Sequence, residues 1–236
     1  MCFFDTMLLH LKNLLTEAEL AQGRALLLAD DAPWIDGRRS AGEQAVQQKN
    51  NQQLAQDSAS AAALRALVLG ALRRDPLLFS AALPKKIFNP LFNRYSGESN
   101  FYGPHVDGAV LRSKVPDQWV RSDISCTLFL SDPQDYDGGE LLMQHPQGER
   151  AVKLPAGDMV LYPSSTVHQV TPVTRGARVA SFFWVESMVR STEQRQLLFD
   201  MDMDLLKLRS ALGESAPAVV GLTGTYHNLL RMWADA

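Results

Sequence analysis

The sequence predicts an α+β protein in which a β-sandwich or jelly roll lies between two helical regions. Three observations predict it. Residues 1–76 are rich in alanine and leucine at helical spacing, residues 77–187 hold short strand patterns separated by Gly, Pro and Asp turns, and residues 188–236 return to helical apolar stripes. Many short strands without alternating helices are typical of a jelly roll rather than of β-α units. We therefore expect three regions with these bounds, the outer two packing on the jelly-roll core.

The N-terminal region is expected to contain two helices. Thr16 followed by Glu19 forms a capping box, which opens a helix that runs to about Leu28. Apolar residues at offsets of three and four predict a second helix over 59–74. The polar stretches 34–38 and 47–53 are expected to be loops.

The central region is expected to supply the strands of the jelly roll. The strand candidates are 87–95, 124–130, 139–144, 151–154, 159–162, 168–173 and 177–185. No Gly-rich phosphate loop occurs, so a nucleotide-binding fold is disfavoured. The apolar stripes of the C-terminal helices need a partner surface, either the outside of the jelly roll or another subunit, so a homo-oligomer through the terminal helices is one expectation.

Composition limits the classes of partner. Apolar residues make up 46% of the chain, enough for a real core, and 23 basic against 26 acidic residues give a formal net charge of −3. That balance offers no general attraction for a phosphate backbone, so we expect no nucleic-acid partner. Only Cys2 and Cys126 are available, which excludes a disulfide framework and favours a reducing compartment. The start has no basic n-region and no apolar run is long enough for a span, so we expect a cytoplasmic protein without a membrane partner.

A His-x-Asp triplet and a later histidine are the candidate metal ligands. His105 and Asp107 are two positions apart on an extended chain and can share one ion. With His168 at the start of a predicted strand they would make the two-histidine, one-carboxylate triad of non-haem Fe(II) oxygenases. The alternative is a hydrogen-bonded His/Asp pair in a turn with an unrelated His168. The remaining histidines are weaker candidates: His10 and His227 lie in expected helices, and His145 in a turn.

Arg178 strengthens the metal hypothesis. It follows His168 by ten residues, and the turn 174–176 should bring its strand back beside the strand that carries His168. On that strand Arg178 shares a face with apolar and aromatic residues, where a guanidinium is costly unless it meets an anion. Its planar fork matches a carboxylate, so a dicarboxylic cosubstrate would satisfy both the metal and the arginine. The alternative is that Arg178 faces solvent beside Arg175.

With these residues in place, the chain resembles the Fe(II)/2-oxoglutarate-dependent dioxygenases of the prolyl 4-hydroxylase type, and more closely the bacterial PKHD-type hydroxylases. Besides the triad and Arg178, the resemblance is carried by 34–38, 49–51, 92–95, 128–133, 135–141 and 222–230. It extends from about Met7 to the C-terminus, so the first six residues look like an extension.

The resemblance implies a distorted double-stranded β-helix that holds Fe(II) on His105, Asp107 and His168. It implies 2-oxoglutarate and O2 as cosubstrates, with Arg178 on the distal carboxylate and ascorbate as an auxiliary reductant. It also implies Tyr95, ten residues before His105, as a residue beside the cosubstrate. The expected activity is hydroxylation of an unidentified small molecule or protein residue with release of succinate and CO2, and some relatives are associated with iron uptake.

Tyr95 and Trp184 each have a structural alternative. Tyr95 is equally consistent with a core tyrosine whose hydroxyl is satisfied. Trp184 shares the Arg178 face and is expected to be either a pocket wall or plain core.

Two other functions fit parts of the sequence. The stretch 155–168 resembles part of a cupin motif, so a cupin-like metal protein is one alternative, although cupins supply a second histidine where Asp107 stands. A non-catalytic sensor of iron or 2-oxoglutarate is the other. Iron-dependent release of succinate from 2-oxoglutarate separates the three.

Overall fold

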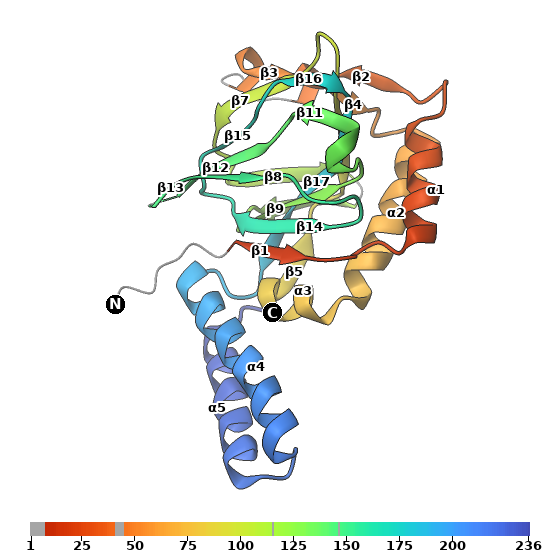
Figure 1. Cartoon of the computed structure of the whole chain (residues 1–236). Coiled ribbons are helices and arrows are strands. Elements are labelled where there is room, and N and C mark those ends of the chain that lie inside the picture. The colour runs from red at the N-terminus through yellow and green to blue at the C-terminus, as the bar shows by residue number, and fades with distance from the viewer. Residues whose placement is uncertain (1–7, 41–44, 115, 146) are drawn as a thin grey trace.

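The computed structural model describes residues 8–40, 45–114, 116–145 and 147–236. Two antiparallel β-sheets face each other in these residues, three helices cover the outside of the larger sheet, and a helical hairpin extends from the body (Figure 1). The larger sheet has the order β1 (Leu9–Leu11), β14 (Met159–Pro163), β10 (Ile124–Phe129), β17 (Arg178–Ser187), β6 (Leu91–Tyr95), β4 (Gln52–Leu54), β2 (Trp34–Asp36), with β5 (Pro84–Ile87) paired to β17.

The smaller sheet carries the candidate metal ligands. Its order is β13 (Gly148–Val152), β12 (Leu141–His145), β15 (His168–Val170), β7 (Phe101–His105), β3 (Lys49–Asn50). Two further strand pairs complete the fold: β11 (Tyr136–Gly138) with β16 (Val173–Gly176), and β8 (Val110–Lys114) with β9 (Asp117–Arg121). Short 3-10 turns lie at Gly37–Ser40, Ala45–Gln47 and Pro133–Asp135. The double-stranded β-helix expected from the resemblance is confirmed.

The outer face of the larger sheet packs on α1 (Glu17–Leu27), α2 (Ala59–Arg74) and α3 (Pro76–Ala82). α1 begins at the predicted capping box, where the Thr16 hydroxyl accepts from the Glu19 amide and the Glu19 carboxylate accepts from the Thr16 amide. α2 presents Leu64, Val68 and Leu72 to the sheet, and every side chain of β10 is buried because its other face lines the space between the sheets. The largest apolar core therefore lies between this sheet and the helices, and a second cluster that includes Tyr95, Phe129 and Tyr162 lies between the two sheets.

The C-terminal hairpin consists of α4 (Thr192–Leu212) and α5 (Pro217–Trp233). It attaches to the body through an apolar cluster of Leu83, Val189, Leu198, Leu205 and Tyr226, and otherwise projects away (Figure 1). Within the described ranges, no helix combines the length and apolar character needed to cross a bilayer.

The N-terminal region differs from the prediction, because it contributes strands as well as helices. Segments 34–38 and 47–53, expected to be loops, supply β2, β3 and β4, and His10 lies in β1 rather than in a helix. These strands have two or three residues each, too few for alternation to be visible in the sequence. They form because their backbone groups complete the edges of sheets built by distant residues: β4 pairs with β6, β3 with β7, and β1 with β14.

The central strands also differ in detail. The candidate 87–95 is interrupted before Leu91, since Pro90 cannot donate to a ladder, and 168–173 is divided between β15 and β16. Strands β7, β8, β9 and β11 lie outside all of the strand candidates. The division into regions 1–76, 77–187 and 188–236 stays a prediction.

Candidate metal centre

The three predicted ligands come together at one end of the smaller sheet. His105 ends β7, His168 begins β15, and the two are directly paired in the register of these strands. Asp107 follows β7 by two residues. The Nε2 atom of His105 lies 4.0 Å from Asp107 Oδ1, and the Nε2 atom of His168 lies 3.8 Å from Asp107 Oδ2. One ligand atom from each residue lies within 4.8 Å of the other two, and all three side chains are largely shielded from solvent.

Both histidines are held in the tautomer that a metal requires. The Nδ1 atom of His105 is 2.8 Å from the Gly103 carbonyl oxygen, and that of His168 is 3.0 Å from the Thr166 carbonyl oxygen. Because a carbonyl oxygen can only accept, each Nδ1 carries a proton, and in a neutral ring Nε2 is then the nitrogen whose lone pair is available to the site. This arrangement orients the rings of metal-ligating histidines in general.

The surroundings keep His105 neutral. Burial, and to a smaller extent the nearby His168, together lower the pKa of His105 to about 4. The Tyr102 ring stacks on the His105 ring with centroids 3.7 Å apart, and the Tyr162 ring meets His168 edge-on. A neutral imidazole binds a metal without first losing a proton.

Lys49 is a cation beside the site that the residue-by-residue reasoning missed. Its side chain is buried against the Tyr102 ring, and burial lowers the pKa of Lys49 to about 8 despite the attraction of Asp107. In the sequence, only the resemblance of the stretch 49–51 to the family points to this lysine. A lysine in a predicted loop carries no sign that tertiary pairing will bury it.

Arg178 lies across the sandwich from the triad. Its side chain is 1% exposed on the inner face of β17, with the guanidinium carbon 5.3 Å from the Tyr95 ring centroid and 5.2 Å from the Phe129 ring centroid. The alternative that it faces solvent beside Arg175 is therefore wrong. Arg178, Ala180, Phe182 and Trp184 share the inner face, as the alternation predicts, since Ser181 and Phe183 point outward.

The expected path of the Arg178 strand was wrong. β17 pairs with β10, β6 and β5 in the larger sheet and not with β15. Between His168 and Arg178 the chain forms β16, which pairs with β11 and ends at Gly176 with φ of +71°. A side chain at Gly176 would place its Cβ 2.0 Å from the Asp135 carbonyl oxygen, so only glycine allows this crossing from one sheet to the other.

Polar atoms around Arg178 lack partners within the described part of the chain. Arg178 Nε, Tyr136 OH and Asn93 Oδ1 are buried without a hydrogen bond there, while Tyr95 OH accepts from Asn93 Nδ2 at 3.3 Å. Buried polar groups of this kind normally have a partner, so their grouping favours a polar ligand between the sheets. The Trp184 ring instead contacts Phe88 and Phe182 edge-on, in an aromatic cluster beneath β9.

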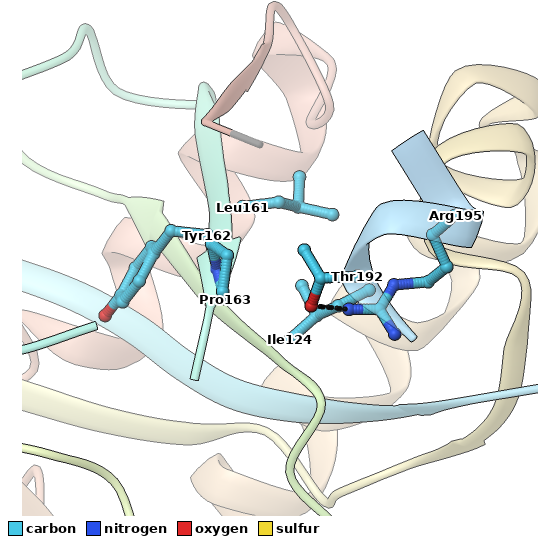
Figure 2. Close-up of a pocket in the computed structure, with 6 residues that line it drawn as sticks. All are labelled: Ile124, Leu161, Tyr162, Pro163, Thr192 and Arg195. Atoms are coloured by element: carbon cyan, nitrogen blue, oxygen red, sulfur yellow. Dashed lines mark hydrogen bonds between the residues drawn. The ribbon is translucent and has the colours of Figure 1, made fainter. Parts of the chain in front are cut away.

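A separate pocket lies at the base of α4 (Figure 2). It is lined by Ile124, Leu161, Tyr162, Pro163, Thr192 and Arg195, and Arg195 donates to the Thr192 hydroxyl and to the carbonyl oxygens of Val189 and Arg190. The lining contains no histidine, cysteine or carboxylate. It is therefore not a metal site and belongs to the attachment of the hairpin.

Comparison with known proteins identifies the family. Residues 90–186 match the 2OG-Fe(II) oxygenase superfamily, and residues 193–235 match the PKHD-type hydroxylase C-terminal domain. A PKHD-type hydroxylase of Variovorax paradoxus is 58% identical over 229 residues, which is 97% of this chain and the whole of that protein; one of Nitrosomonas eutropha is 58% identical over 98% of this chain and the whole of that protein. The chain belongs to the PKHD-type hydroxylases.

Solved structures support the fold of this PKHD-type hydroxylase. A Trichoplax adhaerens prolyl hydroxylase in complex with a hypoxia-inducible-factor peptide aligns with a TM-score of 0.54 at 16% identity, covering 81% of this chain and 86% of that one. The carbocyclase SnoK from nogalamycin biosynthesis aligns with the same TM-score and identity, covering 78% and 81%. At this identity the likeness shows the double-stranded β-helix alone.

Membership of the PKHD-type hydroxylases makes this protein a 2-oxoglutarate-dependent hydroxylase of the Fe(II) oxygenase superfamily, which uses Fe(II), 2-oxoglutarate and O2. The donors fit that metal, since two neutral imidazoles and one carboxylate are the ligand set of non-haem Fe(II) oxygenases. The family favours the oxygenase over the cupin-like protein and the non-catalytic sensor.

Proposed function

We propose that this PKHD-type hydroxylase holds Fe(II) on His105, Asp107 and His168 and hydroxylates a C–H bond of a substrate while 2-oxoglutarate is converted to succinate and CO2. The observation that carries the proposal is the convergence of the three donor groups, with both imidazole Nε2 lone pairs turned toward one carboxylate. Three protein ligands leave three positions of an octahedral ion for the cosubstrate and O2.

Arg178 and Tyr95 are assigned to the cosubstrate. The guanidinium of Arg178 would pair with the distal carboxylate of 2-oxoglutarate through its planar fork, which accounts for a buried arginine on the inner face of β17. Tyr95 is paired with Arg178 across β6 and β17, and its hydroxyl would donate to the same molecule. Bound Fe(II) and 2-oxoglutarate supply the oxidising power with O2, and the protein's part is to orient both and to exclude water.

Finer parts of the proposal rest on the family resemblance and on composition. They are ascorbate as an auxiliary reductant, a cytoplasmic location, a role in iron uptake, and a substrate that is a small molecule or a protein residue rather than nucleic acid or membrane. Growth of a deletion strain under iron limitation tests the role in uptake, and stimulation by ascorbate tests the reductant.

The activity is tested by succinate release. Purified protein is incubated aerobically with 2-oxoglutarate and Fe(II), with and without a metabolite extract, and succinate is measured against controls that contain Zn(II) or a chelator. The proposal predicts iron-dependent succinate formation that rises when the extract supplies a substrate. Succinate at the same level with Zn(II), or none under any condition, would contradict it.

A further inference from the structure

Asp107 is held by a side chain from the opposite sheet. Ser125, on the inner face of β10, lies with its Oγ 2.6 Å from Asp107 Oδ2 and 2.8 Å from the Oγ of Ser164. Both serines are buried, with 2% and 3% of their surface exposed. One chain of hydrogen bonds therefore joins strand β10, the segment after β7 and the segment before β15.

The direction of this chain follows from the number of protons. A hydroxyl has one proton to donate, and an ionised carboxylate can only accept. Ser125 therefore donates to Asp107 and accepts from Ser164. Bonds from a hydroxyl to a carboxylate are short and strong, and a hydroxyl that is itself an acceptor is a better donor.

The position of Ser164 connects this chain to the second histidine. The Ser164 amide donates to the Asp123 carbonyl oxygen, which ties the segment between β14 and β15 to the start of β10. Two residues later the Thr166 carbonyl oxygen accepts from His168 Nδ1. One short segment thus fixes His168 directly and Asp107 through Ser125.

We infer that Ser125 and Ser164 are a positioning pair that fixes the carboxylate of Asp107 for metal binding, an inference that rests on the proposed function. Each histidine already has a backbone acceptor that sets its orientation, whereas Asp107 follows the end of a strand and depends on side chains. The Ser125 proton occupies a lone pair of Oδ2 and restrains the plane of the carboxylate. Partners of this kind are typically worth about 10- to 100-fold in metal affinity.

The test measures binding of Co(II) alone, followed by its visible absorption, with no cosubstrate present. Ser125→Ala should raise the Kd for Co(II) by about 10- to 100-fold, Ser125→Thr should restore most of the affinity because it keeps the hydroxyl, and Ser164→Ala should weaken binding by less than Ser125→Ala. Ser181→Ala is the matched control. Ser181 is buried on the outer face of β17, and its hydroxyl has no partner in the described residues, so its loss should leave the Kd unchanged.

Thermal unfolding of the metal-free variants separates positioning from structure. Ser125→Ala with wild-type Co(II) affinity would overturn the inference, whatever its melting temperature, because a merely structural hydrogen bond changes stability and not affinity. If Ser125→Ala does not fold, the same titration is made with Ser164→Ala. A wild-type Kd for Co(II) in that variant would overturn the inferred role of the two serines.

His168→Ala in the same titration distinguishes the inference from the proposed function. If wild type binds Co(II), His168→Ala does not, and Ser125→Ala binds as tightly as wild type, then only the inference is removed and the proposed function stands. Wild-type protein that binds no Co(II), or His168→Ala that binds as tightly, removes both.

Discussion

Each histidine of the triad is oriented by the carbonyl oxygen two residues before it, Gly103 for His105 and Thr166 for His168. The same local geometry therefore appears at the end of one strand and at the start of another. It sets which ring nitrogen is free, and burial keeps the pKa of His105 low enough for that nitrogen to be unprotonated near neutral pH. The two histidine rings are therefore already oriented for metal binding by contacts within the protein.

Loss of any ligand should remove iron without unfolding the protein. We expect His105→Ala, Asp107→Ala and His168→Ala each to purify with little iron, because three protein donors are the minimum for this kind of site. Elemental analysis after reconstitution measures the iron content of each variant, and circular dichroism checks that each variant is folded. His227→Ala, an exposed histidine on α5, is the matched control and should keep its iron. Full iron content in all three ligand variants would show that the metal is elsewhere.

Arg178 should control the affinity for 2-oxoglutarate and leave the metal nearly untouched. Loss of a buried charge-assisted pair typically costs about 2–5 kcal/mol, or about thirtyfold to several thousandfold in affinity, and Arg178→Lys should fall between wild type and Arg178→Ala because it keeps the charge without the fork. Calorimetric titration of 2-oxoglutarate into protein loaded with Mn(II) measures it. Arg175→Ala, in strand β16, is the control, because Arg175 is exposed and paired with Asp137. Unchanged affinity in Arg178→Ala would exclude the arginine as the anchor.

At the scale of elements, the sequence predicts the helices α1 and α2 from local patterns, but it does not predict strands that depend on pairing with distant segments. The capping box at Thr16 and the apolar repeat of 59–74 gave α1 and α2 because hydrogen bonds and periodicity of a helix are local. The edge strands β2, β3 and β4 were missed because their residues have no strand pattern of their own. Their structure is imposed by β6 and β7, which lie far away in the sequence.

The stability that the N-terminal end of α1 contributes to the fold should depend on pH, because Glu19 titrates there. Hydrogen bonds, chiefly from the Arg74 guanidinium and also from Thr16, lower the pKa of Glu19 from 4.5 to about 2. A carboxylate with a lowered folded-state pKa stabilises the protein above its unfolded-state pKa, and this contribution is lost as the pH falls from about 5 to about 2. Arg74→Ala should therefore be less stable than wild type near pH 6, by up to about 1 kcal/mol for a partly exposed pair, and the difference should shrink at acidic pH.

Thermal unfolding of both proteins between pH 6 and pH 3 measures this difference. Arg73→Ala is the control, since Arg73 is an exposed neighbour on the same helix. A stability difference between wild type and Arg74→Ala that stays constant over this range would mean that Glu19 is not linked to Arg74.

At the scale of the whole molecule, the site exists because two sheets face each other. The smaller sheet carries His105 and His168, and the larger sheet carries Tyr95, Arg178 and Ser125 on its inner face. The sequence identified the ligands and Arg178 by residue type and spacing, but it could not place Arg178 opposite the triad, since the crossing through β16 depends on pairing with β11. Ser125 was missed for the same reason, because a serine in a buried strand gives no sign of the carboxylate it will meet.

The C-terminal hairpin leaves large apolar side chains exposed, among them Leu197, Leu206 and Met232. The expectation of a homo-oligomer through the terminal helices stays a prediction. Light scattering of the purified protein measures the molecular mass in solution, and a mass of a single chain at all concentrations would remove that expectation.

The central claim is that one ion on His105, Asp107 and His168 and one 2-oxoglutarate anchored by Arg178 share the space between the sheets. The most direct measurement is an anaerobic titration of 2-oxoglutarate into Fe(II)-loaded protein, followed by the metal-to-ligand charge-transfer absorption that appears only when the cosubstrate chelates the iron. We predict that the band of the wild type saturates at one equivalent of 2-oxoglutarate per bound iron. Arg178→Ala should require at least about thirtyfold more 2-oxoglutarate, and His168→Ala should develop no band. The account would be contradicted if all three proteins developed the band with equal intensity at the same 2-oxoglutarate concentration, or if wild type developed no band.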